Sequence, residues 1–294
     1  MSVEELLIPP APRLVRAREP VDMHIGQVLL RAGKLTETDI RHIVSMQGVQ
    51  RIRFGDAAVN LGLVDRHDVQ QALSEQFNYP LQRTSDSLLS RSLVTARDPF
   101  GAAAEAFRRL RTQMSMRWFS KNKSLVVTST RSDQGAHLIA ANLAIAFAQI
   151  GIKTLLIDAN FRQPRQQRLF GLEPDKGLST LLVGRASYDE VVCPVDGFGH
   201  LTVICAGPIP PNPQELLETS AFIQAMKWFA QNYDVVIFDS AAMLEFADTQ
   251  TIANRASGCL LSIRRHATRV ADIEHAKSLL VPASAVLVGT VLCD

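Results

Sequence analysis

Residues 124–151 read SLVVTSTRSDQGAHLIAANLAIAFAQIG, and this stretch decides the fold. Residues 124–129 form a short apolar run rich in β-branched side chains, which predicts a buried strand. A polar turn follows, and the alanine-rich segment after it predicts a helix that begins near Leu138. A strand, a turn and a helix in this order are the setting of a phosphate-binding loop.

The chain beyond this stretch repeats the same alternation. Apolar runs of strand length occur at residues 153–159, 201–206, 233–239, 258–265 and 285–292, with helical stretches between most of them. Nearly continuous apolar strands that alternate with helices predict a mostly parallel sheet with helices on both faces. We therefore expect an α/β domain whose site lies at the carboxyl ends of the strands.

The turn after the first strand departs from the phosphate-binding pattern GxxxxGK[ST] when it is aligned on Gly135. Ala136 stands where a lysine would reach the phosphates, and His137 stands where a hydroxyl would bind magnesium. Asp133 adds a carboxylate to a loop that should hold an anion with its backbone amides. Each change disfavours a triphosphate, and taken alone the segment is also typical of an ordinary loop between a strand and a helix.

An internal repeat precedes the α/β region. Residues 24–47 align with residues 53–76, and five residues separate the two copies. The matching pairs are Gly26 and Gly55, Gly33 and Gly62, Asp39 and Asp68, and Gln47 and Gln76. Helical spacing that ends at a glycine predicts two short helices in each copy. Thr36 with Asp39, and Asp65 with Asp68, match the residue pairs that cap a helix N-terminus.

The expected organisation has four segments. They are a flexible tail over residues 1–22, a small all-α tandem-repeat domain over 23–82, a linker over 83–103 and the α/β domain over 104–294. Two helical hairpins could bury their apolar stripes against each other as one unit. On spacing alone, the repeat is also compatible with a helical docking module.

Composition excludes several classes of protein. The 294 residues include 31 basic and 29 acidic side chains, so the net charge of +2 gives no sign of a nucleic-acid partner. Neither a leader peptide nor a membrane-spanning helix is expected, because the longest apolar segment, residues 279–293, is interrupted by polar residues and proline. Cys193, Cys205, Cys259 and Cys293 form no CxxC pair and are expected to be buried thiols in a cytoplasmic protein.

The tandem repeat resembles the N-terminal cyclic di-GMP-binding domain of type II secretion and pilus assembly ATPases. That resemblance implies a cyclic di-GMP site formed by His24, Gly26, Gln47, Arg53, Gly55 and Gln76. Arg53 stands at the family's leading arginine, whereas the first copy has His24 there. An arginine can grip a phosphate or a guanine edge with a charged fork, and a largely neutral imidazole cannot.

The remainder of the chain resembles the kinase domain of bacterial tyrosine autokinases, the exopolysaccharide chain-length determinants related to the MinD and ParA P-loop ATPases. The resemblance rests on segments at 105–118, 128–129, 148–171, 177–182, 210–217, 233–240 and 247–253. Asp158 and Arg162 match the family's DxDxR motif, with Asn160 at its second aspartate. Asp239 matches the aspartate that holds magnesium. The first segment matches the helix that contributes to ring contacts between subunits.

The resemblance implies three competing functions. The favoured one is a pseudokinase in exopolysaccharide biosynthesis that acts with an inner-membrane chain-length partner, lies at the membrane through that partner and senses cyclic di-GMP. The second is an active tyrosine kinase or ATPase that uses Asp158 and Asp239 with ATP and magnesium. The third is a regulator of the MinD or pilus-secretion type.

The favoured function requires no cofactor, because the nucleotide site is degenerate. That site is implied to include Gly135, Ala136, His137 and Arg162. Arg131 precedes the turn and Lys153 begins the next strand, so no nearby cation is expected to replace the missing lysine.

Overall fold

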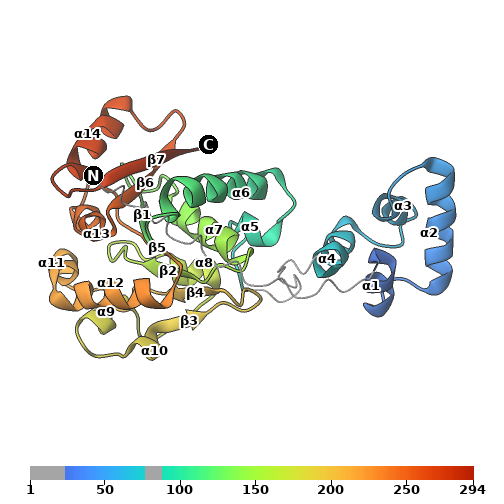
Figure 1. The fold of residues 1–294 in the computed structure, drawn as a ribbon, viewed down its shortest axis with the longest axis horizontal. Helices are drawn as coiled ribbons and strands as arrows, with labels where there is room; N and C mark the ends of the chain where they lie inside the picture. Colours follow the sequence, from blue (N-terminus) through green and yellow to red (C-terminus); the bar gives the residue numbers. More distant parts are fainter. Residues whose placement is uncertain (1–23, 77–87) are drawn as a thin grey trace, which may run out of the picture. The chain divides into compact units, whose positions relative to one another are not determined.

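The computed structural model describes residues 24–76 and 88–294, which belong to two compact units. The first unit is helical and the second is built on a sheet (Figure 1). The tail expected over residues 1–22 lies outside the described residues, as does part of the expected linker.

The two copies of the repeat form the helical unit and fold alike, as expected. Its helices are α1 (Ile25–Arg31), α2 (Glu37–Gln50), α3 (Phe54–Asn60) and α4 (Arg66–Gln76). Gly33 and Gly62 follow the first helix of each copy with the same left-handed φ of +68°. The amide of Asp39 donates to Thr36 at 3.2 Å, and the amide of Asp68 donates to Asp65 at 2.7 Å. The second helix of each copy therefore begins at the expected cap.

The copies are held together by a shared core. Helix α1 packs on α4 and α2 packs on α3, so each contact joins one copy to the other. Val28, Leu29, Ile43, Ala57 and Ala72 are buried between them. An ion pair of 2.9 Å between the half-exposed Lys34 and the largely buried Asp68 also links the copies.

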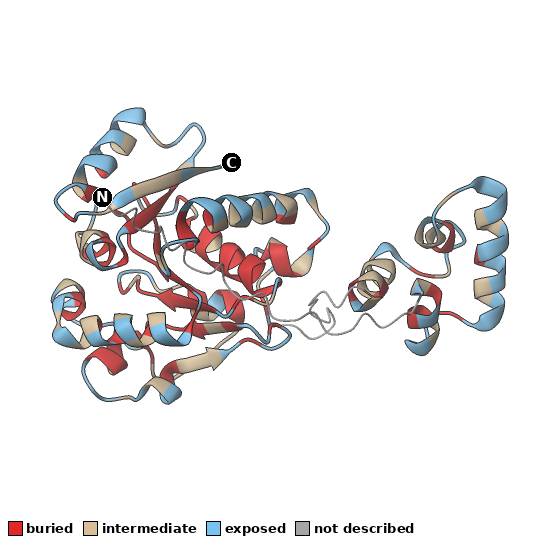
Figure 2. Cartoon of the chain, in the orientation of Figure 1, coloured by how far each residue is buried: buried red, intermediate tan, exposed pale blue. Residues whose placement is uncertain are grey.

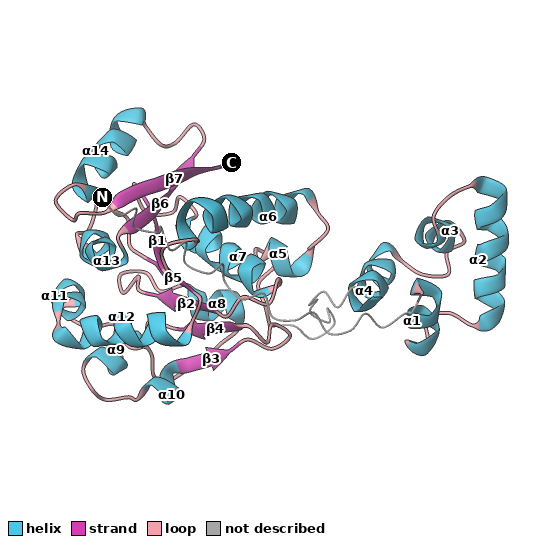
Figure 3. Ribbon diagram, viewed as in Figure 1, coloured by secondary structure: helices cyan, strands magenta, loops and turns pink. Residues whose placement is uncertain are grey.

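The second unit contains a seven-stranded sheet in the order β3-β4-β2-β5-β1-β6-β7 (Figure 3). The strands are β1 (Ser124–Ser129), β2 (Thr154–Asp158), β3 (Val192–Pro194), β4 (Leu201–Ile204), β5 (Val235–Asp239), β6 (Gly258–Arg264) and β7 (Val286–Cys293). All neighbouring pairs are parallel except β3 with β4. The mostly parallel α/β fold is therefore confirmed.

Helices cover both faces of this sheet. One face carries α5 (Val94–Arg97), α6 (Ala102–Met114), α7 (Ala136–Ala148) and α8 (Gln166–Phe170). The other carries α9 (Leu178–Leu182), α11 (Pro213–Glu218), α12 (Ser220–Asn232), α13 (Asp248–Ala256) and α14 (Val270–Leu280). A π-helical turn, Ser115–Phe119, follows α6, and α10 (Tyr188–Val191) precedes β3. The central strands are buried between these layers (Figure 2).

Helix α7 positions the phosphate loop against the sheet. It packs on β1, β2 and β5, and nearly all of its side chains are buried. Its many alanines allow this close approach because they occupy little volume. The helix begins at Ala136, two residues before the expected start, because Gly135 adopts a left-handed φ of 79° and serves as its N-cap.

Three details differ from the sequence-based expectations. The edge strand β3 was not expected, since it is only three residues long and ends in a proline. The described part of the expected linker includes α5, where Leu93 is buried and the amide of Thr95 donates to Asn142 at 2.9 Å. Cys193 and Cys293 are half-buried rather than buried, although all four cysteines are free thiols.

Candidate functional site: a phosphate-type loop closed by its own side chains

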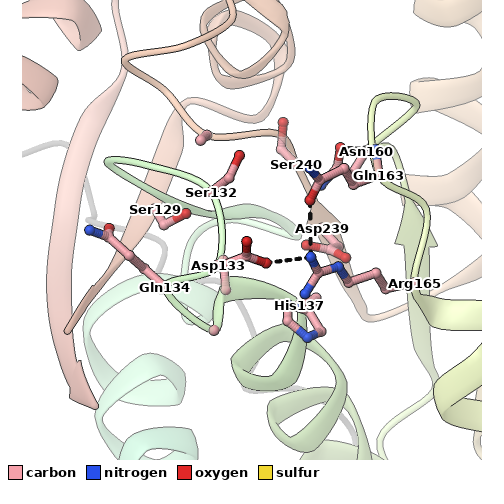
Figure 4. A pocket seen from close by; sticks show the side chains of 13 residues that line it. Ser129, Ser132, Asp133, Gln134, His137, Asn160, Gln163, Arg165, Asp239 and Ser240 are labelled. Carbon is pink, nitrogen blue, oxygen red and sulfur yellow. Dashed lines mark hydrogen bonds and ion pairs between the residues drawn. The ribbon is translucent and has the colours of Figure 1, made fainter. Parts of the chain in front are cut away.

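A small cavity lies where the loop between β1 and α7 meets the carboxyl ends of β2 and β5 (Figure 4). Its lining residues are Ser129, Ser132, Asp133, Gln134, Gly135, Ala136, His137, Asn160, Gln163, Arg165, Asp239, Ser240 and Ala242. The free volume is about 20 Å³, which leaves room for about one water molecule. The cavity is therefore at the edge of the sheet where the parallel fold predicts a site.

Asp158 and Asp239 are brought together by the strand register. They are aligned at the ends of the neighbouring parallel strands β2 and β5, and both are buried. Asp158 accepts hydrogen bonds from the backbone amides of Arg165 and Gln166, each at 2.9 Å, and from Asn160 at 3.2 Å. Its carboxyl group thus organises the loop after β2 and does not line the cavity.

Asp239 does line the cavity, and Gln166 holds it in place. The Gln166 side-chain amide donates to Asp239 Oδ2 at 2.7 Å and to the carbonyl of His137 at 3.1 Å. Asp239 Oδ1 and Gln166 Oε1 are buried without a hydrogen-bond partner in the described part of the chain. Burial raises the pKa of Asp158 to about 6, and burial together with the nearby Asp158 raises the pKa of Asp239 well above its ordinary value.

Two backbone amides of the loop are already bonded to acceptors from the chain. The amide of Arg131 donates to Gln134 Oε1 at 3.2 Å, and the amide of Ser132 donates to Glu245 Oε1 at 2.9 Å. The hydroxyl of Ser132 also donates to Glu245, at 2.6 Å. A loop that binds phosphate needs such amides free to point at the ligand. Here one amide donates to the side-chain oxygen of Gln134 and the other to the carboxylate of Glu245.

Arg165 brings a cation into the site, which corrects the expectation that no cation lies near the loop. Its guanidinium forms an ion pair with Asp133 and donates to Gln163 Oε1 at 3.0 Å (Figure 4). Asp133 adopts a left-handed φ of 64°, a conformation that aspartate tolerates better than most residues. The only arginine that lines the cavity is therefore paired with a carboxylate of the loop.

His137 and Ala136 do not supply the missing charge. Burial, with a smaller effect of the nearby Arg165, lowers the pKa of His137 to about 4. The imidazole is consequently neutral at physiological pH. Ala136 is the first residue of α7 and carries no polar group. The residues as arranged here do not fit a magnesium nucleotide, because Arg165, the cation among the described lining residues, is paired with Asp133 and two loop amides are occupied.

Arg162 lies outside the cavity, in contrast to its implied place in the nucleotide site. It forms a two-pronged ion pair with Asp248, at 3.0 and 3.2 Å, and its guanidinium stacks 4.7 Å from the centre of the Phe246 ring. Asp248 is fully buried at the start of α13. Arg162 therefore neutralises a buried carboxylate and joins the loop after β2 to α13.

The residues implied to bind cyclic di-GMP occupy matching positions in the two repeats. His24 and Arg53 are the exposed N-cap residues of α1 and α3, while Gln47 and Gln76 lie in the last turns of α2 and α4. A Cβ atom added to Gly26 would lie 3.2 Å from the Phe54 ring, and one added to Gly55 would lie 2.6 Å from Val69.

Gly26 and Gly55 lie where two helices pack closely. A side chain at either position would crowd the neighbouring helix. A separate groove on this unit is lined by His42, Ser45, Met46, Val49, Gln50, Leu61 and Leu63, none of which is an implied ligand residue.

Sequence reasoning missed several residues of the cavity region. They are Ser132, Gln163, Arg165, Gln166 and Glu245. Arg165 and Gln166 closely follow the segment that resembles DxDxR. Their position just after β2 is the sequence signal that could have identified them. Glu245 contacts Ser132, which lies 113 residues away in the chain, and no local sequence pattern predicts that contact.

Within residues 24–76 and 88–294, no helix is long and apolar enough to cross a membrane. The same residues contain no cluster of three or more histidine, cysteine or carboxylate side chains arranged for a metal ion.

Comparison with known proteins identifies the fold and the family. No protein-family model matches the chain. The tyrosine-protein kinase YwqD of Bacillus subtilis is 34% identical over 213 residues, which cover 72% of this chain and 90% of YwqD. The tyrosine-protein kinase etk of Escherichia coli strain K12 is 31% identical over 66% of this chain, but that match covers only 27% of etk.

Solved structures agree with this relationship. The chimerical protein CapA2B2 superposes with a TM-score of 0.66 at 30% identity, over 76% of this chain and 97% of the chimera. The kinase domain of Escherichia coli ETK gives a TM-score of 0.66 at 29% identity, over 72% of this chain and 83% of that domain. Pyrococcus furiosus MinD, at 20% identity and a TM-score of 0.50, shares the fold. The chain belongs to the bacterial tyrosine-protein kinases of the capsule and exopolysaccharide chain-length family.

Proposed function

We propose that this protein is a catalytically silent member of the kinase family, a pseudokinase that regulates exopolysaccharide chain length. In this function the α/β unit serves as a docking scaffold for an inner-membrane chain-length protein, and the N-terminal repeat senses cyclic di-GMP. Attachment to that partner would hold the protein at the membrane. The basic helix α6 would take part in contacts between subunits, as the resemblance implies.

The observation that carries the proposal is the state of the phosphate loop. Ala136 and the neutral His137 replace the lysine and hydroxyl positions, and Arg165 is paired with Asp133. Phosphoryl transfer depends on cations that neutralise the charge of the transferred group, with effects of several orders of magnitude on rate. A loop with no free cation cannot supply this stabilisation, whereas the surrounding fold is fully retained.

Calorimetry with Mg-ATP tests the nucleotide part of the proposal. We expect weak or undetectable binding by the unmodified chain. The variant Ala136→Lys with His137→Ser should bind Mg-ATP more tightly, since it returns the lysine and the hydroxyl to an otherwise intact loop. A low-micromolar Kd for the unmodified chain would overturn the proposal.

Complementation in cells tests the scaffold part. Deletion of the protein should change the length distribution of the polymer, and the Asp239→Asn variant should restore that distribution as well as the unmodified chain does. The substitution keeps the shape of the side chain and removes the carboxylate that an active kinase would need for magnesium. A folded Asp239→Asn protein that fails to complement would favour the active kinase instead.

The exposed ends of α1 and α3 support a ligand at the repeat. His24 and Arg53 are related by the repeat, and neither side chain has a hydrogen-bond or ion-pair partner within the described residues. An exposed arginine without an internal partner is available to bind a phosphate or a guanine. Titration of the full-length chain with cyclic di-GMP tests this assignment directly.

A further inference from the structure

Asp133 of the phosphate loop forms an ion pair with Arg165, in which the two side chains are 69% and 35% exposed. Asp133 and its ion-pair partner Arg165 both line the cavity at the N-terminus of α7 (Figure 4). A carboxylate that pairs with an arginine beside a helix N-terminus has the same chemical character as a bound phosphate. Helix α7 is long enough, at 13 residues, to present a substantial dipole there.

A second feature of the cavity is a buried polar atom without a partner in the described part of the chain. Asp239 is 1% exposed, lines the cavity and has an Oδ1 atom without a partner among the described residues. Buried polar atoms in folded proteins nearly always have a partner. The present volume of about 20 Å³ is far too small for a phosphate group, so a ligand could enter only if lining side chains moved.

Glu245 lies outside the cavity lining, in contrast to Asp133. It accepts hydrogen bonds from the amide and hydroxyl of Ser132, it does not line the cavity, and no cation pairs with it in the described chain. Glu245 therefore fixes the outer part of the loop. Asp133 alone combines a place in the cavity with a contact to its cation.

We propose that Asp133 is an internal ligand of the phosphate loop, and that a phosphate-bearing ligand binds Arg165 and the amides at the start of α7 only by displacing it. This inference rests on the proposed function, because it explains why the loop is closed to nucleotide. Arg165 is the cation of the site, although 32 residues separate it from Asp133. The ligand class is a compound with a diphosphate group, either a nucleotide or free pyrophosphate.

The test compares the full-length chain with its Asp133→Asn variant. Each is titrated by calorimetry with Mg-ADP and, separately, with inorganic pyrophosphate. Asparagine tolerates the left-handed backbone at this position, so the change removes the charge and keeps the loop. We expect at least about a tenfold gain in affinity, because the charged hydrogen bonds of Arg165 become available to the ligand. Combining Asp133→Asn with Arg165→Ala should abolish that gain.

Asp272→Asn is the matched control. It releases Arg131 from an ion pair of 3.3 Å next to the same loop, yet neither Asp272 nor Arg131 lines the cavity. The control should leave both affinities as they are in the unmodified chain. An equal gain in the control would mean that general charge removal, and not the loss of an internal ligand, is responsible, and it would overturn the inference.

The remaining outcomes separate this inference from the proposed function. Equally weak binding by the unmodified chain and Asp133→Asn would overturn the internal ligand and leave the silent kinase standing. A gain that survives Arg165→Ala would also overturn it. A gain for only one probe would support it and identify the source of the diphosphate. Low-micromolar binding of Mg-ADP by the unmodified chain would overturn the proposed function, while the affinity ratio between the two chains would still decide the internal ligand.

Discussion

The phosphate loop and the tandem repeat differ in whether their ionisable side chains have partners within the protein. In the loop, Asp133 is paired with Arg165, and the Ser132 amide is bonded to Glu245. In the repeat, His24 and Arg53 are exposed at helix N-termini, and their side chains have no partner in the described residues. The loop groups named here are therefore bonded within the described part of the protein, whereas these two side chains of the repeat are not.

We expect the two regions to differ in ligand binding for this reason. A site whose donors and acceptors bond to one another keeps the fold stable without a ligand, because buried polar groups are costly when unpaired. A site whose charged groups face solvent leaves those groups accessible to a ligand. The predictions below test this comparison, beginning with the largest expected effect.

Replacing Arg162 should damage the fold rather than ligand binding. Arg162→Ala leaves the fully buried Asp248 without its partner, and we expect a loss of about 3–5 kcal/mol in unfolding free energy. Adding Asp248→Asn should recover part of that loss by removing the unpaired charge. Arg131→Ala, which breaks a more exposed pair with Asp272, should cost less than about 1 kcal/mol. Urea denaturation measures all three, and a loss below that of Arg131→Ala would show that Arg162 has no structural role.

Replacing Arg53 should weaken ligand binding rather than the fold. A charged hydrogen bond to a phosphate or guanine contributes about 1.5–3 kcal/mol, so Arg53→Ala should reduce cyclic di-GMP affinity about 10- to 100-fold. The exposed Arg41 of α2 provides a matched control, and Arg41→Ala should leave the affinity unchanged. If both variants bound equally well, or the unmodified chain did not bind at all, the repeat would be a docking module.

The glycines of the repeat should behave as packing residues. A Cβ atom at Gly55 would lie 2.6 Å from Val69, so Gly55→Ala should destabilise the helical unit by about 2 kcal/mol. The solvent-facing Gly48 has nothing within 4 Å of an added Cβ and is the natural control. Thermal unfolding followed by circular dichroism would show the difference. Equal stability of the two variants would contradict the close packing of α3 on α4.

The smallest expected effect concerns His24. His24→Arg restores a cation at the position that matches Arg53, so cyclic di-GMP affinity should rise by up to about tenfold. The change lies at an exposed N-cap without a side-chain hydrogen bond and should leave stability unaffected. Titration of the full-length variant beside the unmodified chain measures the gain. An unchanged affinity would mean that the first repeat does not contact the ligand.

The sequence predicted the fold well because its signals are local. Apolar strand runs, the Gly33 and Gly62 helix ends and the Asp39 and Asp68 caps each depend on a few neighbouring residues, and the structure confirms them. The three-residue β3 escaped because it carries too little pattern, and the packing of α5 on α7 depends on residues far from α5 in the chain.

The candidate site was only partly predictable. The degenerate residues Ala136 and His137 could be read directly from the loop, and Asp239 lines the cavity beside them. The contact between Asp133 and Arg165 is set by how the loops after β1 and β2 meet, and local spacing does not encode it. The pairing of Arg162 with the buried Asp248 joins residues 86 positions apart, and local spacing does not encode it.

The most direct test of the silent kinase is mass spectrometry of the full-length protein after incubation with Mg-ATP, with and without the proposed membrane partner. We expect no phosphate on any tyrosine, because the cavity offers no unpaired cation from the described residues to stabilise phosphoryl transfer. The three tyrosines are Tyr79, Tyr188 and Tyr233. Phosphate on one of them that disappears in the Asp239→Asn variant would show an active kinase and contradict the account.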